Sequence, residues 1–83
     1  MDQIEALIFV QKAVAELNAE RQRQGLSMGD LAEVTGMSEA DARGYLEGGQ
    51  MMTLSDLGRF CAALGVSSFE ILARAEQAYQ ETS

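Results

Sequence analysis

The side chains with the chemistry to recognise a partner are concentrated in the segment GMSEADARGYLEGG, residues 36–49. Three acids of this segment, Glu39, Asp41 and Glu47, surround its only base, Arg43. A carboxylate accepts hydrogen bonds from amino groups, whereas a guanidinium donates parallel hydrogen bonds to anions and to flat acceptor edges. The segment is therefore equipped for polar recognition, and its acidity limits the partners that suit it.

Groups that catalyse reactions are scarce by contrast. The chain has no histidine, and we expect its one cysteine, Cys61, to be a small buried apolar residue. No cluster of metal ligands, phosphate-binding loop or nucleophile beside a base is recognisable. We therefore expect a protein that is not an enzyme and that has no metal, cofactor or small-molecule ligand.

The composition bounds the kind of protein. The 83 residues are expected to form one domain, 1–83, and a hydrophobic fraction of 47% is ample for a core. The 13 acids and 6 bases give a net charge of −7, which favours basic partners and repels nucleic acids and anionic membranes. The first 20 residues are too charged for a signal peptide or a membrane span, so we expect a cytoplasmic protein.

Four hydroxyl residues mark the helices that must hold the segment. Ser27, Ser38, Thr53 and Ser67 each precede an acid by three residues, which is the pattern of a capping box. Glycines that can end a helix follow the first four helical stretches. Because proline and alternating strand patterns are absent, the chain is predicted to be all-α with five helices. They are expected near residues 3–24, 28–35, 39–47, 54–64 and 68–80.

The helical spacing of apolar residues selects the expected core. Its candidates within the helices are Ile4, Leu7, Ile8, Val14, Leu17, Leu31, Ala32, Val34, Ala42, Tyr45, Leu46, Leu54, Leu57, Phe60, Cys61, Leu64, Phe69, Ile71, Leu72 and Ala75. Leu26, Met37 and Val66 are expected to fill the spaces between helices at the turns.

Residues 28–47 have the pattern of a helix-turn-helix, in which two short helices cross steeply after a three-residue turn. Ala32 is the small residue that the crossing needs, and Gly36 supplies the positive φ of the turn. The apolar residues expected to face the core before, within and after the turn are Leu31, Met37, Ala42 and Tyr45.

The chain resembles the lambda-repressor-like helix-turn-helix family, also called the Cro/repressor or Xre type. The resemblance covers about residues 14–72 and rests on the stretches GLSMGDLAEVTGMS, YLEGG and TLSDLGRFCAALGVSSFEIL. It implies a five-helix domain, here with an extended first helix, that binds operator DNA as a dimer. The third helix, 39–47, would then lie in the major groove, with half-sites about one DNA turn apart.

The positions that would contact DNA, or another partner, follow from this resemblance. They are Met28, Ser38, Glu39, Ala40, Arg43 and Gly44. Glu39 could accept from a cytosine amino group, and Arg43 could reach guanine or a phosphate. Ala40 offers only a methyl contact and Gly44 offers none. Few bases surround these positions, although attraction to phosphates provides much of the affinity of proteins for DNA.

Two functions of different classes remain open. The first is a small transcriptional regulator that binds operator DNA, as most members of the family do. The second is an acidic interaction protein of the anti-activator or antirepressor type, which keeps the fold but binds a basic regulatory protein and not DNA. The resemblance favours the first function, and the net charge and the acidic third helix favour the second.

The front of the first helix is the expected homodimer interface, because it adds more apolar surface than one helix face can turn to a small core. The candidate residues are Ile4, Leu7, Ile8 and Phe9. In the other arrangement that the sequence allows, Phe9 and Val10 pack back on the fifth helix, against Ala78 or Tyr79.

Overall fold

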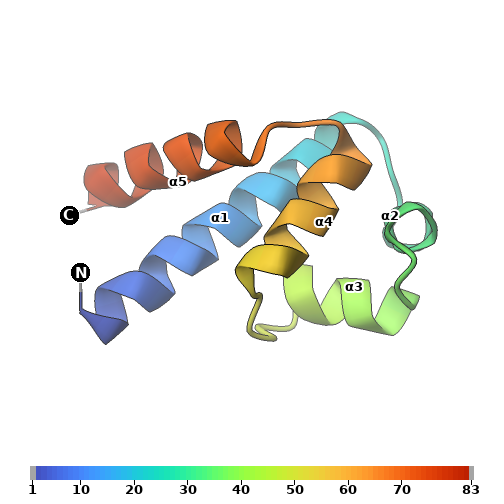
Figure 1. Cartoon of the computed structure of the whole chain (residues 1–83), viewed down its shortest axis with the longest axis horizontal. Helices are drawn as coiled ribbons and strands as arrows, with labels where there is room; N and C mark the ends of the chain where they lie inside the picture. Colours follow the sequence, from blue (N-terminus) through green and yellow to red (C-terminus); the bar gives the residue numbers. More distant parts are fainter. Residues whose placement is uncertain (1, 83) are drawn as a thin grey trace.

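A computed structural model describes residues 2–82 and consists of five helices joined by short turns (Figure 1). The helices are α1 (Gln3–Arg23), α2 (Met28–Thr35), α3 (Glu39–Leu46), α4 (Leu54–Leu64) and α5 (Ser68–Thr82). No strand occurs within the described residues. The predicted all-α, five-helix fold is confirmed, and every predicted helix bound lies close to the observed one.

The helix starts form as the hydroxyl pattern predicts, because each hydroxyl accepts from the backbone N–H three residues on. The backbone N–H groups of Ser27 and Thr53 also donate to the carboxylates of Asp30 and Asp56, so both capping boxes are complete. At Ser38 the hydroxyl accepts from the Asp41 N–H at 3.1 Å, but in the described structure the Ser38 N–H does not donate to the Asp41 carboxylate. Asp41 therefore does not complete the box that its spacing predicts.

The core lies between α1, α4 and α5 on one side and the pair α2 and α3 on the other. Leu17, Leu31, Phe60 and Ile71 come from four different helices and are fully buried. α1 and α5 pack side by side over the most extensive helix contact, with the chain running in opposite directions (Figure 1). Through this contact the 21-residue α1 holds α5 in position.

Five residues predicted for the core lie instead on the surface: Ile4, Leu7, Val34, Leu54 and Phe69. Leu54 and Phe69 lie in the first turns of α4 and α5 and are 75% and 86% exposed. Apolar spacing identifies the face of a helix that can be buried, but it cannot show how far the neighbouring helix extends. The prediction for these five residues was wrong for that reason.

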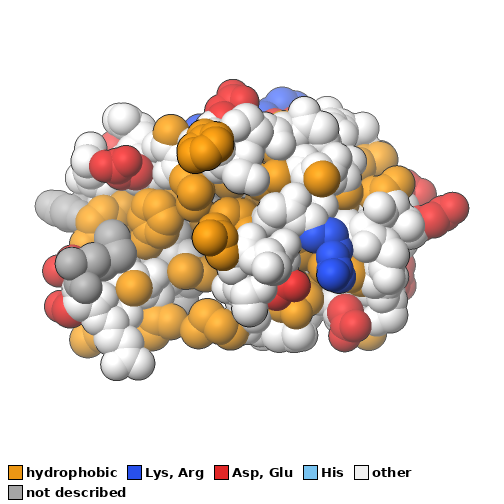
Figure 2. Space-filling view, viewed as in Figure 1, with side chains coloured by type: hydrophobic (Ala, Val, Ile, Leu, Met, Phe, Trp, Pro, Cys, Tyr) orange, Lys and Arg blue, Asp and Glu red, His pale blue; other side chains and the backbone are white. Residues whose placement is uncertain are grey.

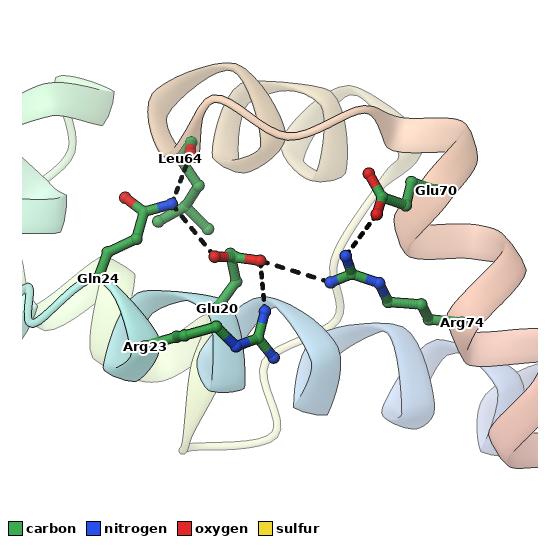
Figure 3. Close-up of polar contacts among 6 residues, drawn as sticks. All are labelled: Glu20, Arg23, Gln24, Leu64, Glu70 and Arg74. Carbon is green, nitrogen blue, oxygen red and sulfur yellow. Dashed lines mark hydrogen bonds and ion pairs between the residues drawn. The ribbon is translucent and has the colours of Figure 1, made fainter.

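A buried polar cluster joins the far end of α1 to α4 and α5 (Figure 3). The carboxylate of Glu20 pairs with Arg23 at 2.6 Å and with Arg74 of α5 at 3.4 Å, although the residue is only 8% exposed. The amide nitrogen of Gln24 donates to a Glu20 oxygen at 3.3 Å and to the backbone oxygen of Leu64 at 2.6 Å. The cluster therefore pairs the buried charge of Glu20 and also supplies a donor to the Leu64 backbone oxygen at the end of α4.

Candidate nucleic-acid interface

The turn between α2 and α3 is built as the helix-turn-helix pattern requires. Gly36 ends α2 in the left-handed region at φ 75°, a conformation that a Cβ would disfavour. The N–H of Met37 then donates to the backbone oxygen of Ala32 at 3.1 Å. Leu31, Ala32 and Ala42 are buried where α2 and α3 cross, so small side chains bring the two helices together.

Tyr45 attaches α3 to α4. Its ring packs edge-on against Phe60, with ring centres 5.9 Å apart and planes at 77°. The pKa of Asp56 is held below its ordinary value chiefly by the backbone N–H and hydroxyl of Thr53, despite some desolvation, with smaller contributions from Tyr45 and the charge of Arg59. Asp56, the ionised acid in the first turn of α4, is therefore also in contact with Tyr45 of α3.

The structure brings most of the predicted contact residues to one surface. Ser38, Glu39, Ala40 and Arg43 lie exposed at the start and outer face of α3. Met28 does not join them, because its side chain is only 6% exposed and packs in the core. The expectation for Met28 is corrected on this ground: residues three and four apart share a helix face, and its partners Leu31 and Ala32 point inward.

Gly44 is half-buried beneath Gln50, a residue that the sequence did not single out. A Cβ on Gly44 would lie 2.6 Å from the Oε1 of Gln50, and the Gln50 N–H donates to the Gly44 oxygen at 3.0 Å. The glycine therefore lets the α3–α4 segment fold back on α3. A glycine within a helix predicts a packing contact, but the sequence does not identify Gln50 as the residue that approaches Gly44.

Arg43 lies between Glu39, at the start of α3, and Glu47, the residue that follows the last turn of α3. Its guanidinium nitrogens are 3.9 Å from an oxygen of Glu39 and 3.6 Å from an oxygen of Glu47. All three side chains are about half exposed, so these pairs are screened by water and weak. The only base of α2 and α3 is thus shared by two acids, with Asp30, Glu33 and Asp41 also on these helices.

Glu39 also reaches across to α2. A Cβ on Gly29 would meet the Oε1 of Glu39 at 2.9 Å, so the carboxylate lies against the first turn of α2. The positive end of the α2 dipole favours an anion there. A DNA phosphate approaching the same turn would compete with this carboxylate. A glycine within a helix predicts a packing contact at Gly29, but the sequence does not identify Glu39 as the side chain that lies against it.

Two kinds of feature were also searched for among the described residues. Among residues 2–82, no helix is long and apolar enough to cross a membrane. The same part of the chain places no group of three acidic or cysteine side chains where they could hold a metal ion.

Comparisons with known proteins agree with this geometry. A family model described as a helix-turn-helix domain matches residues 13–75, which is most of the chain. The chain is also similar to the crystal structure of the clp gene regulator ClgR from Corynebacterium glutamicum, with a TM-score of 0.79 and 23% identity. The superposition covers 89% of this chain and 79% of that one. No curated protein matches.

The family match and the shared fold confirm the resemblance to Xre-type helix-turn-helix proteins. The chain belongs to the helix-turn-helix domain family.

Proposed function

We propose that this protein is a transcriptional regulator that binds operator DNA as a homodimer through the exposed face of α3. The observation that carries the proposal is the presentation of α3, held by buried residues on its inner side with Glu39, Ala40 and Arg43 on its outer side. The similar ClgR protein is described as a gene regulator, which supports the same class of function.

The geometry suggests how α3 would read a base pair. Arg43 would exchange its weak pairs with Glu39 and Glu47 for guanine or a phosphate. Glu39, released from Arg43, would accept from the amino group of cytosine, and Ala40 would contact a thymine methyl. Because the acids repel phosphates, we expect weak binding to random DNA and a requirement for the correct site.

A mobility-shift assay at low salt, with the promoter region of the protein's own gene, tests this function. The expected result is a complex that unlabelled specific DNA removes more effectively than unrelated DNA of the same length. No shift at low salt, from protein whose helix content is intact, would overturn the proposal.

One observation favours the second function, an acidic protein that binds a basic regulator. Residues 28–47 carry five acids and one base, and that base is already held by Glu39 and Glu47. Such a face is complementary to a positive surface. Under this function Glu39→Lys would break binding to the basic regulator, and neither parent nor variant would shift DNA. Tight, site-specific DNA binding by the parent at physiological salt would exclude it.

A further inference from the structure

A groove with apolar walls lies beside the N-terminal half of α1. Two hollows of about 190 Å³ each form the groove, and Val10 lines both of them. The first hollow lies between α1, α4 and α5, and the second lies between α1, α3 and the α3–α4 segment. Figure 2 shows hydrophobic side chains gathered over the half of the molecule where Figure 1 places this part of α1. Glu39, Ala40 and Arg43 line neither hollow, so the groove is separate from the outer face of α3.

The walls of the groove have room for aliphatic side chains of another molecule. The first hollow has no charged lining residue, and Thr53 is its only polar one. In the second hollow, Glu47 is the only charged lining residue. A cavity of ~150 Å³ can hold a benzene ring, so each hollow can receive one aliphatic side chain. Leu7, Met51 and Leu54 of these walls are 39%, 61% and 75% exposed, so the core of the domain leaves this apolar surface uncovered.

Acids border the groove on α1 and on α5. Glu5 lies one helical turn before Phe9, which lines the first hollow. Glu76 lies one helical turn after Leu72, which lines the same hollow from α5. Both glutamates are exposed, and neither forms an ion pair within residues 2–82. Their charges are therefore available to a cationic partner.

Two more acids border the groove on the side of α4 and the α3–α4 segment. Glu47 lines the second hollow, and Asp56 accepts a hydrogen bond at 2.9 Å from the hydroxyl of Thr53 in the first. Arg43 pairs with Glu47 at 3.6 Å, but it divides its charge between Glu47 and Glu39. We call Glu5, Glu47, Asp56 and Glu76 the acidic rim of the groove.

The neighbouring bases do not balance the acidic rim. Lys12 precedes Ala13 on α1, and Arg59 follows Leu57 by two residues on α4. Neither base lines a hollow, and the two stand against four acids. The net charge of −7 has the same sign as the rim. The surroundings of the groove therefore favour a cationic partner.

Apolar walls and an acidic rim together select the occupant. A second copy of the chain would bring the same acids together and would be repelled. Nucleic acids and fatty acids carry anionic groups and would meet the same repulsion. A segment with aliphatic side chains on one face and lysine or arginine beside them satisfies both features. Because Val10 lines both hollows, the two aliphatic side chains must be neighbours, as residues three or four apart on a helix are.

We propose that the groove binds a basic, amphipathic helix of a partner protein. Aliphatic side chains of that helix occupy both hollows, and its lysine or arginine side chains lie against the acidic rim. The inference goes beyond the proposed function, because it adds a second surface that does not include the outer face of α3. It also differs from the second function, in which a basic regulator would bind at Glu39.

The proposal reassigns part of the expected homodimer interface. Leu7 and Phe9 line the groove and would contact the partner helix. Ile4 and Ile8 line neither hollow and, being four residues apart, share another face of α1. That face remains available for the homodimer of the proposed function.

Fluorescence anisotropy at physiological salt, with three synthetic peptides, tests the groove. The first peptide has about 18 residues, all leucine or lysine, with leucine at every third or fourth position so that a helix has one apolar face. The second has the same composition without this periodicity, and the third carries glutamate in place of lysine. The parent protein is expected to bind the first peptide at least about tenfold more tightly than either control peptide.

Two pairs of variants locate the binding site. Leu54→Ala should weaken binding of the first peptide about tenfold, whereas Val34→Ala, at an exposed residue of α2, should leave it unchanged. Glu76→Lys should weaken binding about fivefold, whereas Glu33→Lys makes the same change of charge on α2 and should weaken it far less. Circular dichroism should show the same helix content in all five proteins.

Equal affinity for the first and second peptides would overturn the proposal, because charge alone would then account for binding. Equal effects of Leu54→Ala and Val34→Ala would also overturn it. Binding that Glu39→Lys abolishes and Leu54→Ala leaves intact would place the peptide on α3 and reject the groove. A parent that sediments as a dimer, and that Leu54→Ala converts to a monomer, would assign the groove to a second copy instead.

Discussion

Two arginines of this protein each lie between two glutamates, yet their surroundings differ. Arg74 joins Glu20 and Glu70 at the α1–α5 contact, where the Glu20 side chain is 10% exposed and that of Glu70 is 54% exposed (Figure 3). Arg43 joins Glu39 and Glu47 on the outer face of α3, where both carboxylates are about half exposed. The same residue types therefore connect two helices through one buried carboxylate in one place and form a solvated surface in the other.

The difference assigns the two groups to different tasks. Removing one member of a buried pair leaves an uncompensated charge, so the Glu20 cluster holds the helices in position. Exposed pairs contribute little to stability and exchange partners at little cost. Arg43 and its acids can therefore exchange their ion pairs for contacts with DNA or a protein, whereas Arg74 stabilises the fold.

The largest effect on stability is expected from Glu20→Gln. The change removes the buried carboxylate and its ion pairs with Arg23 and Arg74, so the urea midpoint of unfolding should fall clearly. Glu39→Gln is the matched change on α3 and should alter the free energy of unfolding by no more than about 0.5 kcal/mol. Equal losses for the two variants would remove the distinction between the clusters.

Acid should weaken the fold through Glu20. Burial raises the pKa of this carboxyl, but hydrogen bonds from Gln24 and Arg74 and the charges of Arg23 and Arg74 together lower it below its ordinary value. A group with a lowered folded pKa stabilises above its unfolded pKa, and this stability is lost as the pH falls through the folded pKa. Urea midpoints from neutral pH to about pH 3 should therefore fall less steeply for Glu20→Gln than for the parent. An unchanged slope would contradict this role of Glu20.

Two glycine substitutions sharpen the account of α3. Gly58→Ala meets no atom within 4 Å and should stabilise the protein by close to 1 kcal/mol through helix propensity. Gly29→Ala should gain less, because its Cβ must displace the Glu39 carboxylate from α2. Thermal melts of the two variants measure the difference. Equal gains would show that Glu39 does not rest on α2.

The smallest effect is expected from removing one exposed acid. Glu39→Gln should raise the affinity for random DNA several-fold, because the carboxylate that competes with a phosphate loses its charge. It should also change the sequence preference, because the same side chain is the proposed acceptor from the cytosine amino group. Glu33→Gln removes the same charge from the exposed side of α2 and is the control. The idea fails if both variants raise the affinity equally with unchanged preference, since net charge would then account for the result.

The features that the sequence predicted correctly are those decided by neighbouring residues. Ser27, Gly36 and Thr53 fix helix ends through local bonds and a local φ, and the helix order followed from them. Glu20 was not predicted, because its partner Arg74 lies 54 residues away and only the packed fold brings them together.

At the candidate site, burial likewise depends on contacts between residues that are distant in the sequence. The exposed positions Glu39 and Arg43 could be placed from helical spacing, whereas the burial of Met28 depends on how α2 meets the core. The closeness of Glu39 to Gly29 likewise needs the crossing of two helices. DNA binding by α3 involves a second molecule, so it follows neither from the spacing of residues in the sequence nor from the packing of the chain.

The DNA affinity of Arg43→Ala tests the central claim most directly. Lys12→Ala is the control, because it removes the same charge from α1, away from α3. By anisotropy at low salt with the promoter DNA, Arg43→Ala should lose about 1–3 kcal/mol of specific binding free energy while its urea midpoint stays at the parent value. Lys12→Ala should lose far less. Specific binding that survives Arg43→Ala unchanged would contradict the claim that the exposed pairs of α3 are the recognition surface.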